Sequence, residues 1–187
     1  MIITGTPIAG VAIIDLERRD DDRGFFARTF DREEFLTAGL DPAVEQCNTS
    51  FNHLAGTLRG MHYQLAYAPE VKLVRCVRGA IVDKIVDMRT GSPTYRQHVS
   101  VELTAANRRA LYVPPMFAHG YQTLVDGTEV VYQVSGAYTP EAERGQRYDD
   151  AALRLDWPLA VTKISAKDAG WPLLDVDHAP AGMGATS

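Results

Sequence analysis

Residues 71–88 read VKLVRCVRGAIVDKIVDM and decide the fold class. Apolar and β-branched residues fill two runs, Lys72–Arg78 and Ala80–Met88, and Gly79 separates them. Short runs of this kind, bounded by turn residues, are typical of β-strands. Alternate side chains of a strand point to opposite faces, so the residues of each run can be assigned to one of its two faces.

Ionisable groups share a face with apolar residues on three of the predicted strands. Lys72 lies on the same face as Val74 and Cys76, and two carboxylates share a face with two isoleucines (Ile81, Asp83, Ile85 and Asp87). In residues 58–64 (LRGMHYQ), His62 shares a face with Leu58. A solvated outer face explains any one strand. The three together favour polar groups inside a small barrel, because buried charge is otherwise rare.

Similar runs occur on both sides of this stretch, at Val11–Asp15, Phe25–Phe30, Val44–Phe51, Thr57–Gln64, His98–Leu103, Arg109–Val113, Gly120–Leu124 and Glu129–Val134. We expect one short helix over Asp31–Leu36, capped by Asp31 and stopped at Gly39, and a second near Pro140–Arg144. Met1–Asp15 lacks a basic start and is predicted to be an edge strand rather than a signal peptide. The prediction is an all-β jelly-roll barrel with short peripheral helices, able to hold one small ligand.

Length and charge exclude several classes of protein. The chain has 187 residues, with 19 basic and 24 acidic side chains, a net charge of −5. We expect one domain over residues 1–178 and a disordered tail over residues 179–187. An acidic balance argues against broad nucleic-acid binding. No apolar run reaches the roughly 18–20 residues that span a membrane. Cys47 and Cys76 form no zinc motif or disulfide framework, so we predict two core residues in a cytoplasmic protein.

Two of the five histidines stand in a recognisable spacing. His53, His98 and His178 are predicted to be solvated. Gly56 precedes His62 by six residues and Gly79 follows, and Pro114 precedes His119 by five. This spacing is similar to the two sequence boxes of cupins, the metal-binding jelly rolls.

The metal ligands of the cupin boxes are not reproduced. Gln64 stands where the second histidine would be, Glu70 is displaced, and Thr123 replaces the last asparagine. Two histidines and an amide make a poor site for a first-row transition metal. We therefore expect a cupin-like fold without a metal, in which His62 has another use. A metal-dependent cupin oxygenase stays as an alternative that predicts bound iron or another first-row metal.

An ordered set of segments runs through most of the chain. It comprises residues 23–26 (RGFF), 46–50 (QCNTS), 58–64 (LRGMHYQ), 72–75 (KLVR), 83–94 (DKIVDMRTGSPT), 118–120 (AHG), Tyr132, Tyr138, 156–158 (DWP) and 165–168 (SAKD). In order and spacing, from about Gly5 to Pro172, the set resembles the dTDP-4-dehydrorhamnose 3,5-epimerases of deoxysugar biosynthesis. Within it, LRGMHYQ followed by a lysine ten residues after its histidine is the most specific part.

The resemblance implies a cofactor-free isomerase that forms homodimers through exchanged N-terminal strands. It implies inversion at C3 and C5 of a nucleotide-activated 4-keto-6-deoxyhexose, from dTDP-4-dehydro-6-deoxyglucose to dTDP-4-dehydrorhamnose, through an enolate. His62 matches the base, and Asp168 the carboxylate that orients it. Lys72 matches the residue facing the keto oxygen, and Tyr132 the proton donor on the other face.

The resemblance also implies a set of substrate contacts. Gln46, Asn48 and Arg59 match sugar and diphosphate contacts, while Asp83 and His119 match polar residues of the pocket. The nucleotide contacts are Arg23 and Phe26, with Tyr138 as an aromatic candidate nearby. An arginine such as Arg59 presents a fork of donors that suits a diphosphate.

Three residues depart from the family pattern and leave the exact substrate open. Arg28 stands where a glutamate recognises thymine, and an arginine can only donate hydrogen bonds. Either the enzyme prefers another base, such as that of a CDP-sugar, or Arg28 points elsewhere. Tyr148 replaces a frequent tryptophan, and Lys84 stands in a usually apolar strand position. The sequence is also compatible with inversion at C3 or C5 alone, and with a sugar-binding protein or a ketoisomerase.

Overall fold

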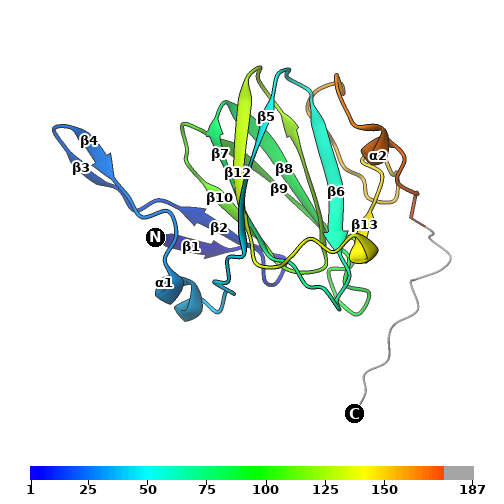
Figure 1. The fold of residues 1–187 in the computed structure, drawn as a ribbon, viewed down its shortest axis with the longest axis horizontal. Coiled ribbons are helices and arrows are strands. Elements are labelled where there is room, and N and C mark those ends of the chain that lie inside the picture. The colour runs from blue at the N-terminus through cyan, green and yellow to red at the C-terminus, as the bar shows by residue number, and fades with distance from the viewer. Residues whose placement is uncertain (175–187) are drawn as a thin grey trace, which may run out of the picture.

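The computed structural model describes residues 1–174, and the predicted disordered tail over residues 179–187 lies outside the described residues. Two antiparallel sheets pack against each other to form a barrel (Figure 1). The six-stranded sheet has the order β1 (Ile2–Gly5), β2 (Ala12–Asp15), β10 (Ala110–Val113), β7 (Lys72–Arg78), β12 (Thr128–Val134) and β5 (Gln46–Asn52). The five-stranded sheet has the order β13 (Glu143–Gly145), β6 (Leu58–Gln64), β11 (Phe117–Thr123), β8 (Ala80–Asp87) and β9 (His98–Thr104). The all-β jelly-roll prediction is confirmed.

The alternation predicted for β7 and β8 is observed. Val74 and Cys76 are 1% exposed and belong to the core between the sheets, as do Ile81 and Ile85. Asp83 is completely buried among them. Burial also raises the pKa of the Cys76 thiol to about 11, which makes it unreactive at neutral pH.

Asp87, the second buried carboxylate of β8, has a structural role. Its oxygens accept hydrogen bonds from Arg89, Ser92 and Thr94 in the turn that follows the strand. Burial works to raise the pKa of Asp87, but these donors outweigh it and hold the pKa far below its usual range. Asp87 thus stays ionised and fixes the loop between β8 and β9.

The short helices agree with the sequence in part. In α1 (Arg32–Thr37), the Asp31 side chain accepts hydrogen bonds from the backbone N–H groups of Glu33 and Glu34, as predicted. The expected helix near Pro140–Arg144 is only the 3₁₀ turn Pro140–Ala142, which leads directly into β13. A further helix, α2 (Ala166–Ala169), was not predicted.

Some boundaries and one burial prediction are wrong. The run Phe25–Phe30 forms a strand only at its start, in β4 (Gly24–Phe26), and β11 begins at Phe117 rather than Gly120. Cys47 is exposed because its side chain points outward from β5, an edge strand of the six-stranded sheet. Met1–Asp15, predicted to be an edge strand, contains two strands, β1 and β2, of which β1 lies at the edge of the sheet.

The remaining histidine predictions and the search for membrane helices give simple results. His53 and His98 are exposed, as predicted, and His178 lies outside the described residues. None of the helices within residues 1–174 has the length and apolar character needed to cross a bilayer.

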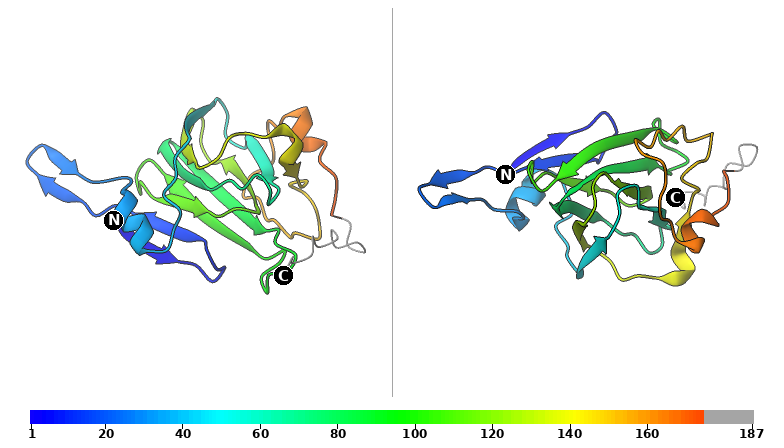
Figure 2. Two further views of the ribbon diagram at one scale, coloured as in Figure 1. Left: turned by 60° about the horizontal axis from the view of Figure 1, so that its bottom comes forward. Right: turned by 90° about the horizontal axis from the view of Figure 1, so that it is seen from above.

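The strands β3 (Arg19–Asp21) and β4 form a separate two-stranded hairpin. It projects away from the barrel on the same side as the N-terminus (Figures 1 and 2). This hairpin pairs with neither sheet of the barrel. Residues on it are therefore placed far from the barrel interior of their own chain.

The C-terminal segment covers the outer face of the five-stranded sheet. Leu153 and Trp157 pack on Met61 and Val86 there. Lys84 lies in the same layer, 4% exposed, with its Nζ atom 3.2 Å from the Ser100 hydroxyl and 5.5 Å from the centre of the Trp157 ring. An aromatic ring and a hydroxyl thus accommodate Lys84 at a strand position that is usually apolar in the family. The segment continues to α2, which reaches the barrel interior.

Candidate active site

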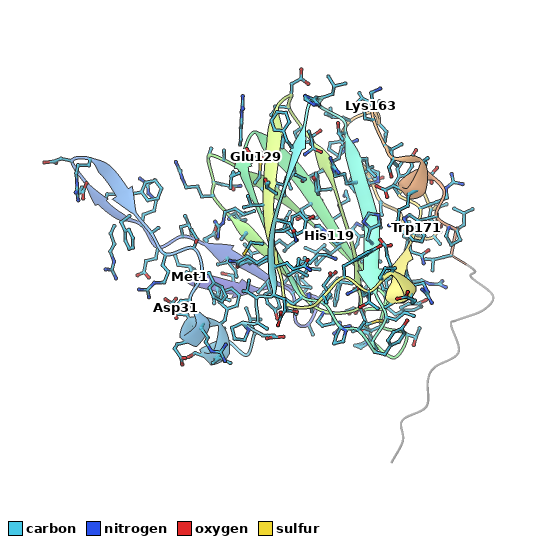
Figure 3. The ribbon with its side chains drawn as sticks, in the orientation of Figure 1. Met1, Asp31, His119, Glu129, Lys163 and Trp171 are labelled. Carbon is cyan, nitrogen blue, oxygen red and sulfur yellow. The ribbon has the colours of Figure 1, made fainter. Side chains whose placement is uncertain are left out.

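A cavity of about 450 Å³ opens between the two sheets. A second cavity of about 290 Å³ adjoins it. His62, Lys72 and Tyr132 line both cavities, so the two form one continuous cleft through these residues. Figure 3 shows His119, one of the residues that line the larger cavity, between the two sheets.

His62 and Asp168 form a hydrogen-bonded pair on one side of the cleft. Nε2 of His62, on β6, lies 2.7 Å from Oδ1 of Asp168. Oδ2 of Asp168 accepts the backbone N–H of Gly60 at 3.2 Å, and the Ser165 hydroxyl caps α2 by accepting the Asp168 N–H. Both carboxylate oxygens are therefore held, and the imidazole is oriented by a fixed acceptor.

The carboxylate of Asp168 is buried but ionised. It is 5% exposed, and burial alone would raise its pKa. The hydrogen bond and charge of His62, together with the Gly60 N–H, outweigh burial and lower the pKa of Asp168 below its usual value. An ionised Asp168 accepts the proton on Nε2, which leaves the lone pair of the neutral imidazole on Nδ1.

Lys72 and Tyr132 face His62 from the other sheet. Tyr132 pairs in register with Val74, which shares a face of β7 with Lys72, so the two polar side chains point into the barrel together. Lys72 is half-buried and forms an ion pair with Glu70. The cleft thus has an imidazole on one side and an ammonium and a phenol on the other.

A second histidine–aspartate pair joins His119, which lines the larger part of the cleft, to Asp83, which is completely buried and lines neither part. His119 on β11 is opposite His62 in register, and its Nε2 lies 2.7 Å from Oδ1 of the buried Asp83. Although these two atoms are close, neither has a partner with the geometry of a hydrogen bond within residues 1–174. Close by, the buried Tyr121 hydroxyl lies 2.7 Å from that of Ser50, and burial raises the pKa of Tyr121.

Most of the predicted substrate contacts also line the cleft. Gln46, Asn48 and Tyr138 line its smaller part. Arg59 lines the larger part, where its Nε donates to Oδ1 of Asn52 at 2.8 Å. This hydrogen bond to Asn52 occupies one edge of the Arg59 guanidinium. These four side chains come from two strands, β5 and β6, and from the loop after β12.

Besides the buried Asp83, three predicted contacts are not brought into the cleft of their own chain. Arg23 lies in the turn of the β3–β4 hairpin and pairs with Asp21, and Phe26 is 62% exposed. Arg28 follows the hairpin and pairs with Asp31 at 2.8 Å. These residues lie outside both parts of the cleft, on the projecting side of the molecule.

The structure adds Glu143 and Lys167, which the sequence predictions missed. Glu143 lines the smaller part of the cleft; the Tyr138 hydroxyl donates to it at 2.7 Å, and Nζ of Lys167 bonds both of its oxygens at 2.6 and 2.7 Å. Burial would raise the pKa of Glu143, but Lys167 and Tyr138 lower it below its usual value. The spacing of Ser165 and Asp168 matches a capping box and could have predicted α2.

Gln64 stands where cupins have their second metal-binding histidine, but its side chain forms hydrogen bonds with backbone groups. Its Nε2 donates to the carbonyls of Ala68 and Ala137, and its Oε1 accepts the N–H of Thr139 at 2.7 Å. These bonds fix the segment that carries Tyr138. Residues 1–174 contain no cluster of three or more His, Cys, Asp or Glu side chains arranged to bind a metal ion.

Comparisons with known proteins agree with this geometry. Residues 5–175 match the family model described as dTDP-4-dehydrorhamnose 3,5-epimerase. A protein of that name from Sinorhizobium fredii is 41% identical over 93% of this chain and 90% of its own. The crystal structure of such an epimerase from Bacillus anthracis, with TDP and PPi bound, has a TM-score of 0.89 and 36% identity over 92% of this chain and 99% of its own. A Legionella pneumophila 3,5-epimerase in complex with dTDP-4-keto-L-rhamnose has a TM-score of 0.87 and 36% identity over 95% of each chain.

Proposed function

This chain belongs to the dTDP-4-dehydrorhamnose 3,5-epimerase family, and from that premise we propose how its own residues invert the two carbon centres. The enzyme is an isomerase that converts dTDP-4-dehydro-6-deoxyglucose to dTDP-4-dehydrorhamnose by epimerisation at C3 and C5. Both carbons are next to the C4 carbonyl, so loss of either proton gives an enolate. The observation that supports the proposal is a base and an acid on facing sides of one cleft.

His62 removes the proton from C3 and from C5. Imidazole side chains ordinarily titrate at about pH 6.5, so a neutral one can accept a proton under physiological conditions. Asp168 holds the Nε2–H tautomer at 2.7 Å, so Nδ1 is the accepting atom. The imidazolium that forms lies beside an ionised carboxylate, which stabilises it.

Lys72 stabilises the enolate oxygen, and Tyr132 returns a proton to the opposite face. One fixed donor at a developing oxyanion is typically worth about 10²–10³ in rate. Inversion needs removal and return from different faces of the sugar, and His62 and Tyr132 lie on different sheets. The half-buried cleft strengthens these charged contacts, since it excludes much of the water.

We further propose that the enzyme is a cytoplasmic homodimer in which the β3–β4 hairpin of each copy completes the cleft of the other. Arg23 and Phe26 are exposed on the hairpin and remain remote from their own cleft. The outer face of the six-stranded sheet is hollowed over about 490 Å³, and Arg75 Nη1 and Gln133 Oε1 are buried there without a partner in residues 1–174. A second copy would cover this face. The free thiols of both cysteines fit a reducing compartment.

The test is proton NMR of dTDP-4-dehydro-6-deoxyglucose incubated with the enzyme in D₂O. We expect the C3 and C5 proton signals to disappear as deuterium replaces them, and a 4-keto reductase to convert the product to dTDP-rhamnose. Loss of only one signal would reduce the proposal to a single-site epimerase. Retention of both signals would overturn it.

A further inference from the structure

Trp171 contacts the imidazole of His62 although it lies in neither part of the cleft. The two ring centres are 6.0 Å apart and the planes are inclined at 65°, an edge-to-face arrangement. Trp171 follows α2 by two residues, so the segment that carries Asp168 also carries this ring (Figure 3). One short segment therefore contacts His62 twice, through a carboxylate and through an indole.

Gly145 provides the space for the indole. It is opposite His62 in the pairing of β13 with β6. A Cβ atom at Gly145 would lie 2.2 Å from Cε2 and 2.3 Å from Cδ2 of Trp171, which real atoms do not tolerate. The indole thus occupies the position that a side chain at 145 would take beside His62.

Packing and one cation hold the ring in place. The indole Nε1 is buried and has no acceptor within the described chain, so no hydrogen bond of its own fixes it. Nζ of Lys167 lies 5.7 Å from the centre of the indole ring, and the same ammonium bonds Glu143 on β13. Lys167 therefore ties Trp171 and α2 to the strand next to His62.

We propose that Trp171 is a positioning residue for His62, an inference that rests on the proposed function. With Nε2 held by Asp168, the freedom left to the imidazole is a small rotation about its Cβ–Cγ bond. The indole blocks this rotation and keeps Nδ1 directed toward the sugar. Edge-to-face aromatic pairs add a modest attraction beyond the area they bury. A small error in the direction of the base has a large effect on rate, because proton removal needs near-contact geometry.

Steady-state kinetics of substitutions at Trp171 test the role. We expect Trp171→Leu to lower kcat by about 10- to 100-fold with little change in KM, since the ring acts on the base rather than on the substrate. Trp171→Phe keeps a flat ring and should recover most of the lost activity. Trp157→Leu is the matched control, because the only other tryptophan packs on the outer face of the sheet. It should lower stability while leaving kcat unchanged.

A double-variant cycle separates positioning from a general loss of stability. Gly145→Ala should push the indole off His62 and lower kcat as Trp171→Leu does. In a Trp171→Leu background, Gly145→Ala should cost almost nothing further, because its methyl group no longer meets the indole ring. Additive losses, or a wild-type kcat in Trp171→Leu, would overturn the inference.

Fluorescence tests the contact without substrate. In a Trp157→Phe variant, Trp171 is the only tryptophan, and a protonated imidazole in contact with it quenches its emission. We expect emission to fall as His62 is protonated, and the titration to vanish when His62→Asn is added. If the emission titrates but the wild-type enzyme has no epimerase activity, the proposed function is contradicted and the contact between Trp171 and His62 is supported. If the wild-type enzyme is active but the emission does not titrate, only the contact is contradicted.

Discussion

The barrel interior and the β3–β4 hairpin both carry predicted substrate contacts, but only the interior is complete within one chain. His62 is fixed by Asp168 at 2.7 Å and faces Lys72 and Tyr132 across the cleft. On the hairpin, Phe26 is 62% exposed and Arg23 bonds only its neighbour Asp21 within residues 1–174. The groups proposed to act on the sugar are therefore assembled by folding of one chain, whereas Arg23 and Phe26, which are predicted to contact the nucleotide, are not.

This difference implies a division between folding and assembly. The interior groups are positioned by two sheets and by α2, which has a capped first turn. An isolated two-stranded hairpin is marginally stable in water. Phe25 lies between the guanidinium groups of Arg18 and Arg108, which supports the hairpin without joining it to the barrel sheets. Changes in the interior should thus reduce kcat, and changes on the hairpin should raise KM.

The largest effect is expected at His62. His62→Asn removes the proposed base, and general bases typically contribute about 10²–10⁴ in rate, so we expect kcat to fall by a factor in that range. Binding of dTDP, measured by calorimetry, should be nearly unchanged because this substitution alters none of the predicted nucleotide and diphosphate contacts. A variant that binds dTDP much more weakly than wild type would show that the two regions are not separate.

Asp168→Asn should have the next largest effect. An asparagine can donate to Nε2 and so favours the wrong tautomer, and we expect kcat to fall by about 10²-fold or more. The pKa of Asp168 is lowered in the folded protein, so its stabilising contribution is complete above its ordinary value of 3.8 and is lost as pH falls through the lower folded value. The unfolding free energies of wild type and variant, from urea titrations, should therefore converge below pH 3.8. A constant difference across that range would contradict the assignment.

The same two regions show how far the sequence could predict the site. Alternation in β7 and β8 placed Lys72 and Asp83 correctly, because a strand with a buried face leaves one choice of register. Glu143 and Lys167 were missed because their meeting depends on the packing of β13 against α2. No local pattern in the sequence predicts contacts between segments that are distant along the chain.

The sequence also could not predict which side chains are buried on an edge strand. Cys47 is a small apolar residue in a run typical of strands, and it was predicted to be in the core. Its strand, β5, is an edge strand whose outer face no element of this chain covers within residues 1–174. Which face of an edge strand is covered depends on the assembly, and composition does not carry that information.

Complementation between subunits tests whether the hairpin belongs to a neighbouring cleft. Phe26→Ala with Arg23→Ala should raise KM by about 10-fold or more, because nucleotide contacts are lost, and leave kcat nearly unchanged. Unfolded and refolded together, this variant and His62→Asn should form mixed dimers with one cleft that has both an intact base and an intact hairpin. Low-KM activity should then reappear at up to about a quarter of the wild-type level, given random pairing. No recovery, with mixed dimers confirmed by mass spectrometry, would place the hairpin outside the neighbour's cleft.

The smallest effect is expected at Arg28, where the sequence allows either a role in base recognition or a contact elsewhere. A guanidinium that read the base would need free donors directed at the ligand, but Nη1 of Arg28 bonds Asp31 at 2.8 Å and lies 3.8 Å from Glu34. Asp31 is also the N-cap of α1, so the pair fixes the chain between the hairpin and the helix. Arg28→Gln should therefore change the ratio of kcat/KM for dTDP- and CDP-linked substrates by less than about threefold, because an exposed ion pair contributes little. A wild-type preference for the CDP-sugar that Arg28→Gln abolishes would instead show that Arg28 leaves Asp31 to read the base, and would make the hairpin region the determinant of nucleotide choice.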